Sequence, residues 1–402
     1  MATDLSRAGA TTIAGIEREL DRIWAARDLT TDVDGVRGRH VAARTSVLNL
    51  VVVALGPELA ARATATLDAL PGRPPSRTLV VVPEDPDGPS ELRAEIEARC
   101  RLPRDAEPEI CSETILLRPG GETGRHLASI VAPLLVHDLP VTLWWPGEPP
   151  PFGSPLATEL LAMADRLVVD GSGWPGDGLA MIRDLAAFQA ATGASVSDFA
   201  LVRQSRWREA IASVFDLPDL LPFLPHVKRI AVSYAATPAD ERGAPRPGGP
   251  PPATANAVKP LYHAAWLASR LDLSVVAPLA LRSGSRTPGP VRDATLRGAQ
   301  GEVRVTLGGV PSRMPPGTTL EIELLAERRG AELRAEVTAD AERIVVRAHL
   351  DGLTLVDRAF LLPRRREPDL LEEALELGTR DRIGAAALRL AAALVGGGRA
   401  DG

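Results

Sequence analysis

Lysine and cysteine are scarce in this chain of 402 residues, and each shortage excludes a class of function. Lys228 and Lys259 are its only lysines. This removes any P-loop lysine and leaves few candidates for Schiff-base chemistry. The only cysteines, Cys100 and Cys111, are typical of a protein kept in a reducing compartment. They could form one bridge, but two free thiols are favoured.

Long hydrophobic runs and an excess of positive charge are also absent. The longest uncharged apolar run, 127–136, is about half the length that spans a bilayer. The first six residues show no basic-then-apolar leader. The net charge of -6 argues against nucleic acid or an anionic membrane as the main partner. We therefore expect a cytoplasmic protein that binds neither nucleic acid nor membrane.

The sequence contains no recognisable catalytic, cofactor or metal motif. Its six histidines are scattered, and no pair of them has the spacing of metal ligands. The glycine-rich segment 118–126 could present backbone N–H groups to a phosphate, but it lacks the ending of a P-loop. An ordinary turn between a strand and a helix is the favoured interpretation. Ser172 and Ser283 have glycine neighbours without forming a Gly-x-Ser-x-Gly elbow.

Strand-like and helix-like segments alternate from residue 47 to residue 191. The expected strands are 47–55, 78–82, 110–117, 141–145 and 166–169, and the expected helices are 57–70, 90–101, 122–136, 154–164 and 178–191. Such alternation predicts an α/β fold whose mostly parallel sheet is covered by helices.

The chain is too long for one ordinary core, and the proline-rich connector 216–225 suggests where it divides. We expect an amphipathic helix within 1–32, an α/β domain over 33–216 and a smaller α+β domain over 217–402. Strand-like runs joined by short turns predict an antiparallel meander in this last domain. Its segment 237–254 is rich in proline and glycine and is expected to be a loop.

A strand with two tryptophans stands out within the first of these domains. Its apolar run 141–145 begins after Pro140 and ends at a Pro-Gly turn. Adjacent strand residues point to opposite faces, so Trp144 and Trp145 cannot fill the same side of a sheet. One of them is expected in the core. The other, at the end of the strand, is either packed under a helix or available to a partner.

The segment DLPVTLWWPGEPPPFG (138–153) resembles the signature of the OpcA family, the glucose-6-phosphate dehydrogenase assembly proteins. Further agreement lies at 44–52, 164–170, 206–209 and 215–216, with a weaker match at 369–373. Asp198 and Arg203 also fit the family pattern, whereas Ala200 and Leu201 replace the asparagine and tryptophan expected between them.

The resemblance implies a non-catalytic protein without cofactor or metal. Such a protein would bind glucose-6-phosphate dehydrogenase and promote its assembly or allosteric activation in the oxidative pentose phosphate pathway. The alternative is an enzyme acting on a sugar phosphate such as 6-phosphogluconolactone. It is conceivable because an open α/β sheet binds ligands at its strand ends and arginine suits phosphate.

Two segments are candidates for contact with the dehydrogenase, because tryptophan and arginine dominate the energetics of protein interfaces. The predicted partner-binding residues are Trp144, Trp145, Pro146, Gly147, Arg206, Trp207 and Arg208. The first four are expected to lie at the partner surface or to support it. Trp207 shares a helical face with Ile211 and Val214 and could equally belong to the core.

Overall fold

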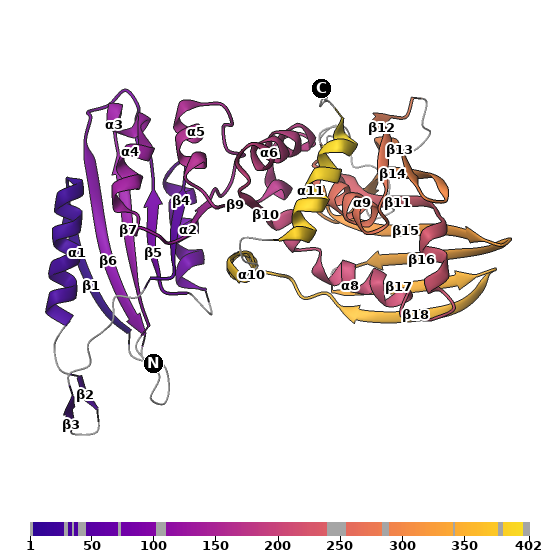
Figure 1. The fold of residues 1–402 in the computed structure, drawn as a ribbon, viewed down its shortest axis with the longest axis horizontal. Coiled ribbons are helices and arrows are strands. Elements are labelled where there is room, and N and C mark those ends of the chain that lie inside the picture. The colour runs from indigo at the N-terminus through magenta and orange to yellow at the C-terminus, as the bar shows by residue number, and fades with distance from the viewer. Residues whose placement is uncertain are drawn as a thin grey trace. The chain divides into compact units, whose positions relative to one another are not determined.

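The computed structural model describes residues 3–27, 31–33, 36–38, 46–70, 74–101, 110–238, 255–283, 289–340, 342–376 and 381–396. The chain divides into two compact units (Figure 1). The first unit comprises Met1–Val169, Thr192–Ser195 and Glu367–Thr379, and the second comprises Asp170–Ala191, Val196–Arg366 and Arg380–Gly402.

This division falls earlier than the connector 216–225, at which the sequence places the domain boundary. Part of the connector forms the 3₁₀ helix η3 (Leu221–His226), which lies inside the second unit. Independent folding of 33–216 and 217–402 therefore stays a prediction. The expected loop 237–254 lies outside the described residues from position 239 onward.

The first unit contains a mostly parallel sheet, as the alternating pattern predicts. Seven strands of an eight-stranded sheet lie in this unit, in the order β1-β6-β7-β5-β4-β8-β9, and the eighth, β10 (Ser195–Asp198), has residues in both units. The seven strands are β1 (Thr3–Ala10), β4 (Leu48–Val53), β5 (Ser76–Val81), β6 (Leu92–Arg101), β7 (Ile110–Pro119), β8 (Val141–Trp144) and β9 (Arg166–Val169). The pairs from β7 to β9 are parallel, whereas β6 runs antiparallel to both β1 and β7.

Helices flank this sheet, and Figure 1 shows α3 and α4 lying over it. The helices of the first unit are α1 (Ile13–Arg27), α2 (Pro57–Asp68), α3 (Gly121–Arg125), α4 (Leu127–Val131), η1 (Ala132–Leu134), α5 (Pro155–Ala162) and α10 (Glu367–Glu376). A small hairpin pairs β2 (Thr31–Val33) with β3 (Val36–Gly38). The strands β5 and β9 are buried along their whole length, including the polar residues Ser76, Arg77 and Thr78 of β5 and Arg166 of β9.

The helix expected over 90–101 is wrong, because this segment forms strand β6. Its apolar residues Ala94, Ile96 and Ala98 alternate with charged ones and are buried. A period of two residues fits a strand with one covered face. The antiparallel register sets Cys100 opposite Cys111 on β7.

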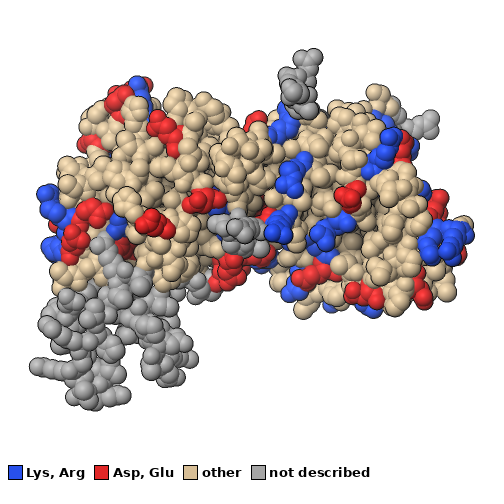
Figure 2. Space-filling model, in the orientation of Figure 1, with Lys and Arg blue, Asp and Glu red and all other residues tan. Residues whose placement is uncertain are grey.

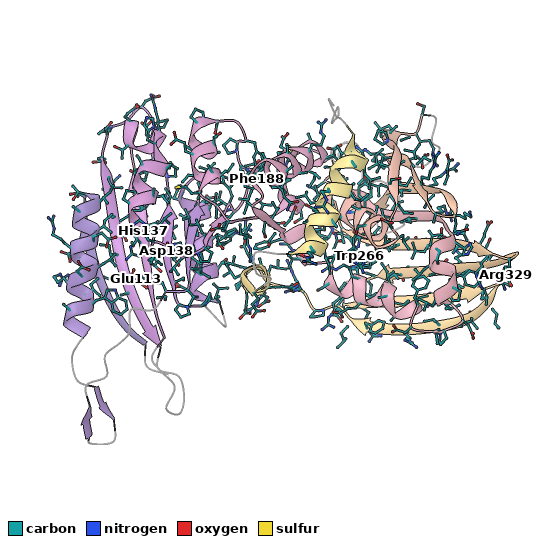
Figure 3. The ribbon with its side chains drawn as sticks, in the orientation of Figure 1. Glu113, His137, Asp138, Phe188, Trp266 and Arg329 are labelled. Atoms are coloured by element: carbon teal, nitrogen blue, oxygen red, sulfur yellow. The ribbon has the colours of Figure 1, made fainter. Side chains whose placement is uncertain are left out.

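One polar network is buried in the first unit. Glu113 on β7, labelled in Figure 3, accepts hydrogen bonds from the Arg77 Nε at 2.8 Å and from the Trp24 Nε1 at 2.7 Å. The Arg77 guanidinium also donates to the Leu134 carbonyl and pairs with Glu17. The charges are therefore compensated inside the core, as buried charges must be.

The second unit contains an eight-stranded sheet in the order β12-β13-β14-β11-β15-β16-β17-β18. The strands are β11 (Val227–Pro238), β12 (Ser274–Leu281), β13 (Val291–Gly298), β14 (Gly301–Ser312), β15 (Thr319–Arg328), β16 (Ala331–Ala339), β17 (Arg343–Leu350) and β18 (Leu353–Leu361). Only β11 and β14 pair in parallel, and β15 to β18 form the expected antiparallel meander.

Helices cover one face of this sheet. They include α8 (Ser205–Val214), which contacts β16 and β17, and α9 (Val258–Arg270), which contacts β11 (Figure 1). The remaining helices that lie mainly in this unit are η2 (Gly171–Gly173), α6 (Leu179–Thr192), α7 (Phe199–Val202) and α11 (Arg382–Val395). Among the described residues, no helix is long and apolar enough to cross a membrane.

The opposite face of the second sheet is polar. On β14, the buried residues Val303, Val305 and Leu307 alternate with Arg304 and Thr306, which point the other way. Cross-strand ion pairs cover this face, including Arg334–Glu323 and Arg347–Asp357. Acidic and basic side chains are interspersed over the visible surface of the second unit (Figure 2). This alternation is typical of an antiparallel sheet with one solvated side.

Candidate functional site

The structure buries both tryptophans of the predicted partner-binding strand. The exposed fraction is 0% for Trp144 and 1% for Trp145. The backbone N–H of Trp145 donates to the Val168 carbonyl at 2.9 Å, and strand β8 lies between β4 and β9. The idea that one indole is exposed is therefore wrong, because both faces of this interior strand are covered. The assignment of the segment to a partner surface stays a prediction.

The turn that follows the two tryptophans requires glycine. Gly147 has a φ of 89°, a conformation that residues with a side chain rarely adopt. A Cβ atom at this position would lie 3.0 Å from the Leu59 Cδ1 of helix α2. Pro146 is buried and Gly147 is half-buried. The Trp-Trp-Pro-Gly sequence is thus explained by packing within the first unit.

The second predicted segment lies on helix α8 in the second unit. Trp207 is 6% exposed, and its ring centroid is 5.1 Å from that of His263 on α9. The half-buried Arg208 donates from Nη1 to the Leu201 carbonyl at 2.9 Å. Arg206 is the exposed member of the predicted set, and its side chain pairs with Glu209 at 2.8 Å. The two predicted segments therefore belong to different compact units.

A polar cluster in the second unit brings together residues from several family motifs. We call it the Arg203 cluster, and it consists of Asp170, Ser172, Asp198, Arg203, Lys259, Tyr262 and His263. Arg203 donates from its two terminal nitrogens to the two carboxylate oxygens of Asp170 at 2.7 and 2.8 Å. Its Nη1 also donates to the Ser172 Oγ at 3.1 Å, and that hydroxyl donates to Asp170 at 2.6 Å.

The carboxyl group of Asp198 fixes the backbone of the cluster from inside. It accepts hydrogen bonds from the backbone N–H groups of Gly171 and Ala200 at 2.9 and 2.8 Å, and Tyr262 Oη lies 3.0 Å from its other oxygen. A Cβ at position 171 would lie 2.6 Å from that same oxygen, so this position requires glycine. Asp198 thereby also caps the short helix α7.

Burial controls the protonation of these groups. Burial raises the pKa of Asp198 to about 7, and the negative charge of Asp170 adds to the rise. Burial and the neighbouring Asp198 raise the pKa of Tyr262 well above its usual value. Asp170 has a lowered pKa: burial acts to raise it, but the bonds from Arg203 and Ser172 outweigh that effect. The cluster therefore holds one carboxylate paired with arginine and one carboxyl group that titrates near neutral pH.

Lys259 and His263 lie one turn apart on α9. Burial lowers the pKa of Lys259, and the positive charge of Arg203 lowers it further. Burial lowers the pKa of His263 well below its usual value, with Arg208 and Lys259 acting in the same direction. His263 is consequently neutral at pH 7. Among the described residues, the Lys259 ammonium group has no hydrogen-bond or ion-pair partner.

The arrangement offers charge and hydrogen bonding without an evident catalytic set. The Ser172 hydroxyl donates to Asp170, but that carboxylate is itself paired with Arg203, and no histidine is hydrogen-bonded to the hydroxyl within the described part of the chain. No group of acidic, cysteine or histidine side chains in that part could hold a metal ion.

Sequence reasoning identified part of this cluster. Asp170, Asp198 and Arg203 lie in segments that resemble the family, but Tyr262 and His263 were not singled out. The signal for them was available: Lys259, Tyr262 and His263 are polar residues at helical spacing in a helix that is otherwise apolar as far as Ala268. His137 and Asp138 lie in the first unit before strand β8 (Figure 3).

Comparisons with known protein families identify the chain's family. A family model described as the glucose-6-phosphate dehydrogenase subunit N-terminal domain matches residues 67–187. A second, described as the C-terminal domain of the same subunit, matches residues 194–388. Both are models of OpcA. The chain belongs to the OpcA family.

Individual relatives of this OpcA-family chain are distant. A Synechococcus elongatus protein named as the OxPP cycle protein OpcA is 24% identical over 186 residues, which is 46% of this chain and 37% of that protein. The match thus spans little more than a third of the relative's length. Solved structures include scyllo-inositol dehydrogenase from Lactobacillus casei (9% identity, TM-score 0.42, 87% and 95% of the two chains). The transcriptional regulator Gal80p from Kluyveromyces lactis is also similar (11% identity, TM-score 0.42, 87% and 91%).

Proposed function

We propose that this OpcA-family chain is a non-catalytic cytoplasmic protein that binds glucose-6-phosphate dehydrogenase. In this proposal it promotes assembly or allosteric activation of the enzyme and so serves the oxidative pentose phosphate pathway. The observation that carries the proposal is that two family models named for a subunit of this dehydrogenase match residues 67–187 and 194–388. The lack of an evident catalytic set among the described residues supports the non-catalytic part.

The partner surface is proposed to include the outer side of helix α8. Arg206 is suited to this role because it is exposed, carries a permanent charge and pairs only with its helical neighbour Glu209 among the described residues. Such an exposed pair is worth little to folding, so Arg206 can change partners at small cost. Trp207 and Arg208 would hold α8 in place through their contacts inside the second unit. Trp144 to Gly147 would hold the turn after β8 rigid.

The test is to mix the purified chain with the dehydrogenase and to measure complex formation and NADP⁺ reduction. Arg206→Glu should weaken binding about tenfold or more, because reversing a charge at an interface places like charges together. Arg22→Glu is a matched control, since Arg22 is also exposed and pairs with Glu19 three residues away at 2.7 Å. Both variants should keep the wild-type melting temperature.

The possible results distinguish an error in the proposed function from an error in the proposed binding surface. Failure of the wild-type chain to bind or activate the dehydrogenase would contradict the proposed function itself. Binding by wild type that survives Arg206→Glu would leave the function standing and place the surface elsewhere. Turnover of 6-phosphogluconolactone by the chain alone would contradict the non-catalytic part and favour the enzyme alternative.

A further inference from the structure

A groove of about 240 Å³ in the first unit lies between the start of strand β4 and the end of helix α10. We call it the Val47 groove, and its lining includes four aliphatic residues and two glutamates, namely Val47, Leu48, Leu70, Leu375, Glu372 and Glu376. Val47 is 52% exposed, whereas the strand that follows it is buried from Asn49 onward. A cavity of about 150 Å³ accommodates benzene. The Val47 groove can therefore receive one large apolar side chain.

The Val47 groove also carries negative charge. Glu372 and Glu376 are four residues apart on α10 and so lie on the same side of this helix. The last turn of α10 contains no basic residue, although a helix C-terminus favours positive charge. Glu376 is exposed and has no hydrogen-bond or ion-pair partner among the described residues. A positively charged group beside the groove would therefore be favourable.

The helix that forms one wall of the groove is fixed within the first unit. Glu367, at the start of α10, accepts hydrogen bonds from the Nε and Nη2 of Arg62 on α2 at 2.7 and 2.6 Å. Leu370, Leu371 and Ala374 of the same helix are buried. A surface that is already ordered loses little conformational entropy when a partner binds. The groove is thus preformed for a partner with an apolar side chain and a nearby positive charge.

The edge strand β18 of the second unit has the complementary apolar character. It carries more exposed large apolar side chains than any other element of the described chain, namely Leu353, Leu355, Phe360 and Leu361. Proteins normally protect the edge of a sheet with charge, proline or a covering element. The opposite edge of this sheet, β12, contains Pro278 and is contacted by α11. Strand β18 contains no proline, and its exposed apolar residues favour association.

Basic residues follow this edge strand directly. The segment 361–366 reads Leu-Leu-Pro-Arg-Arg-Arg. Leu361 is 76% exposed, and the exposed Arg364 has no hydrogen-bond or ion-pair partner among the described residues. Because Pro363 keeps the residue before it extended, Leu361 and Arg364 lie roughly 10 Å apart along the chain. The end of β18 therefore presents an apolar side chain and a guanidinium group together.

We propose that the chain self-associates, with Leu361 of one copy entering the Val47 groove of a second copy and Arg364 pairing with Glu376 beside it. A second copy is the occupant that the structure supports, because the groove and a surface of matching apolar character and opposite charge lie on the same chain. The pairing of guanidinium and carboxylate would orient the contact. The other exposed side chains of β18 would extend it, since a stable interface buries about 1,000 Å² or more.

The experiment uses the full chain without the dehydrogenase, so its result does not depend on the proposed function. Sedimentation velocity and light scattering are measured over a wide range of chain concentration. The wild-type mass should rise from that of a monomer to that of a dimer or larger species. Leu361→Asp and Val47→Lys should each weaken self-association roughly 30-fold or more, the loss typical of a residue that anchors an interface.

Each of these variants has a matched control. Leu55 is 43% exposed and follows the other end of β4, so Leu55→Lys is the control for Val47→Lys. Leu221 is 53% exposed and lies in η3 of the second unit, so Leu221→Asp is the control for Leu361→Asp. Both controls should associate like wild type. All four variants should keep the wild-type melting temperature, because each changes an exposed side chain.

A charge exchange tests the proposed ion pair. Glu376→Arg and Arg364→Glu should each weaken self-association about tenfold, because each places like charges together. The chain that carries both changes restores the attraction with its polarity reversed, and its association should recover. Glu159→Arg is the control, since Glu159 is an exposed glutamate on α5 of the first unit and should tolerate the change.

Several results would overturn the proposal. The first is a wild-type chain that stays monomeric at every concentration. The second is self-association that survives both Leu361→Asp and Val47→Lys, or that the control variants weaken equally. The third is a pair of charge reversals whose losses are not recovered when they are combined. If the chain is monomeric and Val47→Lys instead weakens its complex with the dehydrogenase, that enzyme occupies the groove and the proposal of a second copy is wrong.

Discussion

The two sheets of this protein differ in what they place on their faces. Strands β5 and β9 of the first unit are buried throughout, and their side chains on both sides belong to the core. The sheet of the second unit buries one face and covers the other with ion pairs. Core positions constrain sequence through packing, whereas polar faces remain available for contacts. The most distinctive motif of the chain thus lies where side chains are least accessible.

This contrast changes how the tryptophan motif is interpreted. A pair of tryptophans followed by Pro-Gly invites the idea of an exposed anchor, but the structure explains the motif by burial and by the close approach of Leu59 to Gly147. The carboxyl group that titrates near neutral pH, Asp198, lies in the polar cluster around Arg203 in the second unit.

The largest expected effect is in the first unit. Trp145→Ala should lower the free energy of unfolding by about 3–5 kcal/mol, because it removes a large side chain that is 1% exposed. Trp266→Ala in the second unit, where the indole is half-buried, should cost less. Denaturant unfolding of both variants measures the difference. If both variants lose the same free energy of unfolding, or if Trp145→Ala is as stable as wild type, the two tryptophans do not differ in their contribution to the core.

The next effect is a pH dependence in the second unit. The pKa of Asp198 is about 7 in the folded chain against 3.8 as its usual value, so the folded state holds this proton more tightly. The stability that Asp198 contributes is therefore complete below about pH 4 and is lost as the pH rises to about 7. Wild type should lose about 1.4 kcal/mol per pH unit in this window relative to Asp198→Asn.

The asparagine variant is a suitable reference because its side chain resembles the protonated carboxyl group. Its amide oxygen can accept from the N–H groups of Gly171 and Ala200, and its amide nitrogen can donate to Tyr262. Urea unfolding of both proteins between pH 4 and pH 7.5 gives the difference between their free energies of unfolding at each pH. If this difference does not change with pH, Asp198 holds its proton no more tightly in the folded state than in the unfolded state.

Local periodicity predicted much of the fold. The strand 166–169 is predicted with its observed bounds because it has a clear apolar pattern. Segment 90–101 was misassigned since its many charged residues mask a period of two. Strand β1 was missed because it is stabilised by pairing with β6 rather than by its own sequence. Tertiary pairing decides such segments.

The candidate site was predictable only in part, for a different reason. Asp170, Asp198 and Arg203 could be named from family motifs, but their convergence with Tyr262 depends on how η2, α7 and α9 pack. The burial of Trp145 could not be settled from the sequence, because a residue at the end of a strand looks accessible there. The strands that flank β8 in the sheet, β4 and β9, are separate segments of the chain.

A smaller effect tests the turn after the tryptophans. Gly147→Ala should cost about 1–2 kcal/mol for the left-handed backbone and about 1 kcal/mol or more for the contact with Leu59. Gly153→Ala is the matched control, because Gly153 also has a positive φ of 83° but no atom within 4 Å of its Cβ position. Thermal unfolding should show a greater loss for Gly147→Ala. Equal losses would mean that Leu59 moves aside without penalty.

The smallest effect is expected on the open face of the second sheet. Arg347 pairs with Asp357 at 3.5 Å, and their side chains are 49% and 61% exposed. Arg347→Ala should change the free energy of unfolding by less than about 1 kcal/mol, because exposed ion pairs gain little over hydration. The small stabilisation by this ion pair should vanish in about 1 M salt, where screening is nearly complete.

The buried Arg77–Glu113 pair of the first unit is the counterpart of this exposed pair. Removing one partner there leaves a buried charge and costs about 3–5 kcal/mol. Arg77→Ala and Arg347→Ala, unfolded side by side at low and high salt, should therefore differ several-fold. If Arg347→Ala is as damaging as Arg77→Ala, the open face contributes to folding as much as a core does, and it is not a surface free to meet a partner.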